Sequence, residues 1–234
     1  AGRTAEILDP ATNAPVARVA SGTKEDVDAA VDAARRAFES PDWHDQDPSK
    51  RGRLLFLLGQ QIRDRFEELA RLESLNVGKP LREAKGDVAY VYKLFEYYAG
   101  MADKIQGATI PVPGARLDYT MREPLGVTAH IAPWNYPLLL ACLGIAPALA
   151  AGNTVVLKPA SLTPLTALKV AELAAAAGFP AGVLNVVTGP GREVGEALVR
   201  HRDVDSVTLT GSTETGKQLL RIAADRVTPT ALEL

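Results

Sequence analysis

Residues 154–191 read TVVLKPASLTPLTALKVAELAAAAGFPAGVLNVVTGPG, and this stretch decides the fold. Its two short apolar runs, TVVLK and VLNVV, have the length and the β-branched content of buried strands. Between them, Thr163-Pro164 starts a helix and Gly178 ends it, because proline suits the first turn of a helix and glycine suits the position just past its end. A strand, a helix and a second strand in this order predict a parallel pair of strands.

The same alternation continues on both sides of this unit. Further strand candidates are VTAHIA at 127–132, SVTLT at 206–210 and PTALEL at 229–234, and Gly211-Ser212 starts another helix. Five strands separated by four helices predict an α/β fold, with a doubly wound, five-stranded parallel sheet covered on both faces. Such sheets bind ligands outside the carboxyl ends of their strands.

The first third of the chain has helical periodicity instead. One predicted helix starts at Thr23, which has Asp26 three residues later, and a second, longer one starts at Asp47-Pro48 and carries apolar positions as far as Leu69. A third is expected from about Leu81 to Met101. Proline and glycine then punctuate the segment 107–127, within which RLDYTM alternates as a strand does.

Composition narrows the class of protein. The chain has 234 residues, of which 47% are hydrophobic and 23% charged, as is usual for globular proteins. A net charge of -2 without a long basic run argues against a nucleic-acid surface. Residues 1–20 lack the order of a signal peptide, and the longest apolar run, 138–151, is shorter than the roughly 20 residues that cross a bilayer. We therefore expect a soluble, cytoplasmic protein that is not bound to a membrane.

Cysteine and histidine usage adds two expectations. The single cysteine, Cys142, excludes an intramolecular disulfide and fits a reducing compartment. The three histidines, His44, His130 and His201, are scattered without metal-ligand spacing, so each is expected to be a surface or hydrogen-bonded residue, and no metal site is predicted.

Four polar loops follow the predicted strands: PWNYP, KPAS, TGPGREVG and TGS. Residue by residue, each allows two interpretations. The glycines 189, 191 and 195 depart from the G-x-G-x-x-G spacing and fit a tight turn as well as a phosphate loop. Ser212 fits a helix N-cap or a phosphate ligand, and Lys158 fits a solvated lysine or a partner of ribose hydroxyls. For Asn135 the local pattern favours an N-cap over a donor to an oxyanion.

Taken together and in order, these loops resemble the aldehyde dehydrogenase superfamily. The resemblance rests on REPLGV at 122–127, PWNYP at 133–137, APALAAGNTVVLKPAS at 146–161, GFPAGVLNVVTGPG at 178–191, LTGSTETG at 209–216 and LEL at 232–234. It implies a Rossmann-like core at 131–234, a bridging, oligomer-forming hairpin at 116–130 and a helical N-terminal part of the coenzyme-binding domain at 1–115. An irregular glycine loop argues against the alternative of an ordinary Rossmann-type reductase.

Members of this superfamily oxidise aldehydes to carboxylic acids with NAD or NADP, through a thioester on a cysteine. The resemblance implies that Asn135 donates to the oxyanion and Glu233 is the general base. It also implies a cofactor site formed by Ile131, Ala132, Pro133, Trp134, Asn135, Lys158, Ala160, Ser161, Gly191, Gly211, Ser212 and Thr215. The full-length protein is expected to be a dimer or tetramer of identical subunits.

Three positions depart from the superfamily pattern. The nucleophilic cysteine should follow the glutamate, but the chain ends at Leu234, and Cys142 lies in an apolar helix where cysteines are usually inert. We therefore expect an N-terminal, coenzyme-binding portion without the catalytic domain, inactive by itself; the alternative is a non-catalytic nucleotide-binding or interaction module. Gly144 stands where many relatives have a lysine. Ser161 stands where many NAD-specific members have a glutamate, so NADP is admissible beside NAD.

Overall fold

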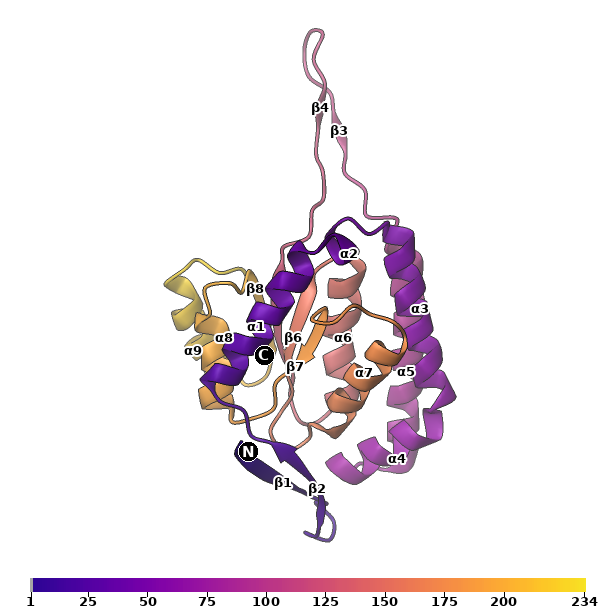
Figure 1. Ribbon diagram of the computed structural model, residues 1–234, viewed down its shortest axis with the longest axis vertical. Coiled ribbons are helices and arrows are strands. Elements are labelled where there is room, and N and C mark those ends of the chain that lie inside the picture. Colours follow the sequence, from indigo (N-terminus) through magenta and orange to yellow (C-terminus); the bar gives the residue numbers. More distant parts are fainter. Residues whose placement is uncertain (1) are drawn as a thin grey trace.

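The computed structural model describes residues 2–234 (Figure 1). The first half of the chain forms these elements: β1 (Thr4–Leu8), β2 (Pro15–Ala20), α1 (Lys24–Glu39), α2 (Pro41–His44), α3 (Pro48–Asp64), α4 (Phe66–Val77), α5 (Leu81–Met101), β3 (Thr109–Ile110) and β4 (Asp118–Tyr119). The second half forms these: β5 (Val127–Ile131), α6 (Pro137–Ala150), β6 (Thr154–Lys158), α7 (Leu165–Ala176), β7 (Leu184–Val186), η1 (Gly191–Gly195), α8 (Glu196–Arg200), β8 (Ser206–Thr210), α9 (Thr213–Ala224) and β9 (Thr230–Glu233).

The five predicted strands form one parallel sheet in the order β7-β6-β5-β8-β9. The chain moves outward from β5 through β6 to β7, returns past β5 to β8, and continues outward to β9. The predicted doubly wound α/β fold is therefore confirmed. Its order reverses beside β5, and that reversal opens a crevice between the loops that follow β5 and β8.

Helices cover both faces of the sheet and create two hydrophobic cores. On one face α6 and α7 pack together with α3 and α5, and on the other α1, α8 and α9 cover the strands. Successive residues of β6 alternate between the two: Val155 and Leu157 belong to the first core and Val156 to the second. All three are fully buried, which explains why TVVLK is apolar throughout.

The predicted starts of α1 and α3 are confirmed by their caps. Thr23 and Asp26 form a capping box at α1, and the side chain of Asp47 accepts the N–H of Ser49 at the start of α3. The long second helix, however, was predicted wrongly. It ends at Asp64, and α4 starts again after Arg65, whose φ of -106° and ψ of 27° break the helix. No proline or glycine marks this break, so the apolar spacing continues across it.

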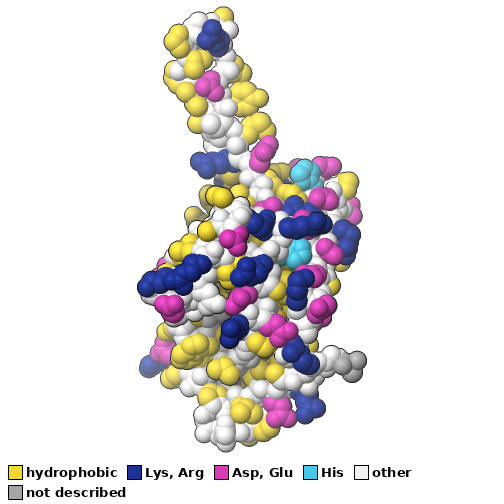
Figure 2. All heavy atoms as spheres, turned by 90° about the vertical axis from the view of Figure 1, so that its left-hand side faces the viewer, with side chains coloured by type: hydrophobic (Ala, Val, Ile, Leu, Met, Phe, Trp, Pro, Cys, Tyr) yellow, Lys and Arg dark blue, Asp and Glu magenta, His cyan; other side chains and the backbone are white. Residues whose placement is uncertain are grey.

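Two antiparallel pairs lie outside the main sheet. β1 and β2 pair near the N-terminus, in a segment for which we had predicted no strands. β3 and β4 pair in a long arm that projects from the body (Figure 1), and Figure 2 shows apolar side chains along it. The arm lies earlier in the chain than the 116–130 expected, because residues from Val127 onward belong to β5 in the main sheet. Within residues 2–234, no helix is both long and apolar enough to cross a bilayer.

Candidate active site

The candidate site lies at the carboxyl edge of the parallel sheet. Ile131 ends β5 and is paired in register with Lys158 at the end of β6 and with Leu209 near the end of β8. On the far side of β8, Thr210 is paired with Glu233. Parallel pairing therefore brings the loops after β5, β6, β8 and β9 to one edge, as the sequence predicted.

Lys158 is the most unusual residue of this edge. It is only 4% exposed, and within residues 2–234 its Nζ has no hydrogen-bond or ion-pair partner. A methyl group added to Gly191 would lie 4.0 Å from that Nζ, so the ammonium faces the glycine loop. Burial lowers the pKa of Lys158 from 10.5 to about 8, because a charged amine loses its water there. An anionic or hydroxyl-rich ligand would give this lysine the partner that it lacks.

A cavity of about 500 Å³ opens between the glycine loop and α9. Three of the predicted cofactor residues line it: Ile131 from β5, Gly191 from the start of η1, and Thr215 from α9. The remaining lining residues are Arg192, Gly195, Glu196, Val199, Gln218, Leu219 and Ile222. Gly195 belongs to the glycine loop that the sequence singled out, but the predicted cofactor site did not include the other lining residues. Leu219 and Ile222 follow Thr215 at helical spacing, and that spacing was the available signal.

Glycine residues leave one wall of this cavity without side chains. Gly191 and Gly195 both border it, and a methyl on Gly195 would only reach van der Waals contact with Ile131, at 3.9 Å. Gly189 has a φ of 144°, in the region that glycine favours, which turns the chain into η1. This wall of the cavity therefore suits a ligand that approaches the backbone closely.

The hydroxyl groups near this cavity have partners within the protein. Ser212 is the N-cap of α9, where its Oγ accepts the N–H of Thr215 at 3.2 Å, so its structural interpretation is confirmed. Ser161 Oγ donates to the carbonyl oxygen of Gly189 at 2.7 Å and joins the loop after β6 to the glycine loop. Ala160 lies half-buried just before Ser161, and Gly211, just before Ser212, donates its N–H to the carbonyl of Glu233 at 3.0 Å.

The loop after β5 places Asn135 on the surface. The favoured interpretation of Asn135 as an N-cap was wrong, because α6 has Tyr136 as its N-cap and no side-chain cap. The chain bends over residues 134–136, and Asn135 lies one residue before the N-cap position, which Tyr136 occupies. Asn135 is exposed, Trp134 is 59% exposed, and Ala132 is held by its N–H to the carbonyl oxygen of Lys158 at 3.0 Å.

A second cavity of about 500 Å³ lies beside the first, and Ile131 lines both. The exposed residue Glu233 lines it, together with Thr210 and Gly144. His130 lines it as well, at 6% exposure, and both ring nitrogens are hydrogen-bonded: Nε2 with Thr128 Oγ1 at 3.0 Å and Nδ1 with Thr208 Oγ1 at 2.7 Å. Burial lowers the pKa of His130 to about 4, so the ring is neutral near pH 7.

Cys142 does not reach either cavity. It is fully buried in α6 within the hydrophobic core, and burial raises the pKa of its thiol well above the usual range. A thiol that stays protonated is a poor nucleophile. This agrees with the expectation that Cys142 is a core residue.

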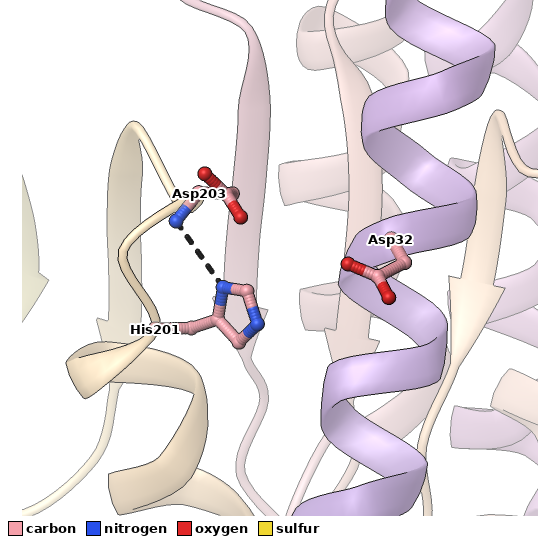
Figure 3. Close-up of side chains that lie close together, drawn as sticks. All are labelled: Asp32, His201 and Asp203. Atoms are coloured by element: carbon pink, nitrogen blue, oxygen red, sulfur yellow. Dashed lines mark hydrogen bonds between the residues drawn. The ribbon is translucent and has the colours of Figure 1, made fainter.

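His201 belongs to a separate cluster with Asp32 and Asp203, away from the carboxyl edge (Figure 3). The N–H of Asp203 donates to His201 Nδ1 at 3.2 Å, so the neutral ring carries its proton on Nε2, which faces Asp28 Oδ1 at 3.6 Å. Neither ring nitrogen then has a free lone pair for a cation. With this tautomer the cluster offers a cation carboxylate oxygens but no imidazole nitrogen. His44, the third histidine, is exposed with its ring edge-on to Phe38.

Comparisons with known proteins agree on one family. A family model described as "Aldehyde dehydrogenase family" matches residues 1–234. Hydroxyisobutyraldehyde dehydrogenase from Mycolicibacterium austroafricanum is 50% identical over 233 residues, which cover 100% of this chain and 46% of that protein. The NADP/NAD-dependent aldehyde dehydrogenase PuuC of Escherichia coli is 48% identical over 223 residues, covering 95% of this chain and 45% of that protein. In a solved NAD+ complex, the aldehyde dehydrogenase from Bacillus cereus has a TM-score of 0.97 and 45% identity, covering 99% of this chain and 48% of its own. The chain thus spans about half the length of these relatives.

Proposed function

Because the chain belongs to the aldehyde dehydrogenase family, we propose that it provides the NAD(P)-binding site of an enzyme that oxidises an aldehyde to a carboxylic acid. The observation that carries this proposal is the cavity at the reversal of strand order, which Ile131, Gly191 and Thr215 line from three different segments. The solved NAD+ complex of the similar Bacillus cereus enzyme supports the choice of ligand.

The residues of this edge fit a nicotinamide dinucleotide. Its phosphates and ribose hydroxyls need donors, and the buried ammonium of Lys158 and the N-terminal amides of α9 after Ser212 supply them. The bare wall at Gly191 and Gly195 admits a pyrophosphate close to the backbone. When bound, the cofactor would supply the hydride acceptor of the oxidation. Ala132, Pro133, Trp134, Ala160, Ser161 and Gly211 complete the proposed site.

Asn135 and Glu233 are proposed as the catalytic residues of this chain. The exposed carboxamide of Asn135 is free to donate to a developing oxyanion, and Glu233 borders the second cavity, where a water molecule would be activated. The buried Cys142 cannot serve as the nucleophile. The roles proposed for Asn135 and Glu233 both depend on a nucleophilic thiol, and Cys142 does not provide it.

Both nicotinamide cofactors are included in the proposal. Ser161 carries no negative charge that would repel a 2′-phosphate, and its hydroxyl is occupied by Gly189. The Escherichia coli relative, whose name gives NADP before NAD, supports the same breadth.

The arm is proposed to join identical subunits. It exposes Leu117 at 75%, Met121 at 70% and Tyr119 at 57%, and its two short strands leave their outer edges open. Sedimentation velocity tests this: self-association that is lost in Leu117→Asp supports it, and a monomer at all concentrations contradicts it.

A fluorescence titration tests the proposed cofactor site. The chain is titrated with NADH and with NADPH, and we expect saturable enhancement of the nicotinamide emission that Lys158→Met weakens at least about tenfold, as expected for the loss of charged hydrogen bonds. Lys93→Met, an exposed lysine of α5, is the matched control. Failure of both nucleotides to bind, or equal binding by the Lys158→Met variant, contradicts the proposal.

The competing function is a non-catalytic nucleotide-binding or interaction module with the same scaffold. Incubating the chain with NAD+ and a short aldehyde should yield no NADH under either function. The coding sequence after Leu234 separates the two functions. An open frame that contains a later cysteine supports the enzyme, and an immediate stop codon supports the module.

A further inference from the structure

Helix α4, the turn after it and helix α5 each place one charged residue in the interior. Glu73 is fully buried, and the side chains of Lys79 and Asp87 are each 10% exposed. The Nζ of Lys79 lies 2.7 Å from Asp87 Oδ2 and 3.5 Å from Glu73 Oε1. We call these three residues the buried charge cluster. Burying charges is costly unless each is paired and hydrogen-bonded, so the other partners of Glu73 matter.

One partner of Glu73 is the first turn of α6. Pro137 starts this helix without an N–H, and its N-cap, Tyr136, provides no side-chain bond. Glu73 Oε1 instead accepts the N–H of Leu138 at 3.4 Å. A carboxylate is favourable at this end of a helix, where the dipole is positive. The cap of α6 therefore comes from a distant helix rather than from its own loop.

The other oxygen of Glu73 reaches the first turn of α7. Thr166 Oγ1 donates to Glu73 Oε2 at 2.8 Å, and one turn further along α4 the side chain of Asn76 accepts the N–H of Leu165 at 3.1 Å. The residue before this helix, Pro164, also provides no cap. Thus α4 holds the starts of both helices that follow the loops after β5 and β6.

The loop that carries Asn135 is held on both sides of that residue. Lys79 Nζ lies 4.0 Å from the centre of the Tyr136 ring, a cation–π contact, and Thr163 Oγ1 donates to the carbonyl oxygen of Trp134 at 3.3 Å. Within residues 2–234, the side chain of Asn135 itself has no hydrogen-bond partner. Its position depends on its neighbours.

We propose that Glu73, Lys79 and Asp87 are positioning residues that fix the loop after β5 and thereby aim the carboxamide of Asn135. Glu73 holds the end of the loop at Leu138, Lys79 holds Tyr136, and Asp87 holds Lys79. Fixing the loop is independent of the reaction. The consequence for an oxyanion rests on the function proposed above for Asn135.

Amide hydrogen exchange of the whole chain tests the cluster. In Glu73→Gln we expect the Leu138 amide to exchange about tenfold faster, which corresponds to about 1.4 kcal/mol, because glutamine cannot present two acceptor oxygens. The amide of Val156 in β6 should be unchanged. The matched control is Glu67→Gln on the same helix, where an exposed glutamate pairs with Lys85 at 2.7 Å. Acrylamide quenching of Trp134 gives a second readout, since Trp43 is buried at 1% exposure.

Two outcomes overturn the proposal: Leu138 exchange in Glu73→Gln that matches Glu67→Gln, or faster exchange at Leu138 and Val156 alike, which shows a general loss of stability. If Glu73→Gln does not fold, Tyr136→Leu decides. This 43% exposed ring is not part of the core, and its removal should raise the quenching of Trp134 about twofold at unchanged urea stability. Unchanged quenching refutes the role of Lys79. NADH binding by the parent chain is measured separately, so its failure refutes the cofactor site without altering the exchange result.

Discussion

Replacing Lys158 by methionine should stabilise the folded chain while it weakens nucleotide binding. Lys158 is 4% exposed and has no partner for its ammonium among residues 2–234. Methionine keeps an unbranched apolar stem of similar length but removes the charge. The fold therefore loses little packing and no longer has to keep an ammonium group away from water.

The size of the effect follows from the pKa. Burial lowers the pKa of Lys158 from 10.5 to about 8, and a difference of one in pKa corresponds to about 1.36 kcal/mol. At pH 7 the lysine is charged in both states, so its burial costs on the order of 3 kcal/mol. Between the two pKa values the unfolded chain binds more protons than the folded chain, so stability rises with pH. At pH 9.5 the cost falls to about 1 kcal/mol.

Urea unfolding at both pH values measures this cost. The Lys158→Met variant should be more stable than the parent at pH 7, and its advantage should shrink by on the order of 2 kcal/mol at pH 9.5. Lys93→Met controls for the general effect of removing a lysine. An advantage of the same size at both pH values would refute the reasoning, because it would show that the ammonium of Lys158 is fully solvated.

Three further predictions concern the same region. NADH affinity of the parent chain should fall between pH 7 and pH 9.5, because Lys158 loses its proton above about pH 8, whereas the affinity of Lys158→Met should not fall. A fluorescence titration at each pH measures this, and the same pH dependence in both proteins would contradict it. Gly144→Ala should destabilise the fold by about 1–3 kcal/mol in urea, since the added methyl would lie 2.4 Å from His130 Nδ1. Unchanged stability of Gly144→Ala would contradict the close contact between the His130 ring and residue 144. Cys142 should not react with a thiol reagent such as DTNB until urea unfolds the chain. If Cys142 of the folded chain reacted as fast as an exposed thiol, its burial would be contradicted.

Local signals were enough to predict the sheet and most helix ends. Thr23, Asp47 and Ser212 cap helices as their side chains allow, and Gly178 follows the end of α7. These features act over a few residues, so a sequence shows them directly. The central strands β5, β6 and β8 were equally plain, because strands buried on both faces have no polar side, whereas the edge strands β7 and β9 are only partly buried.

Two of the errors share a physical cause, which is that the deciding contact lies far away in the chain. α6 has no local cap because Glu73 supplies one from 65 residues away, so assigning that cap to Asn135 was wrong. The break at Arg65 turns α4 toward α7, a direction that apolar spacing cannot reveal. The burial of Lys158 was also missed, since a lysine at the end of a strand is usually solvated.

The position of α1 has a consequence for how the chain acquires its structure during synthesis. This helix is made early, yet its apolar stripe, which includes Val27 and Val31, packs on β5, β6 and β7. Val187, which shares that core, emerges roughly 150 residues later, about 7–30 s at ordinary rates of translation. During this interval the apolar stripe of α1 stays exposed, because part of the core that buries it has not yet been synthesised. Chaperone dependence should therefore be greatest for ribosome-bound chains that end before β7.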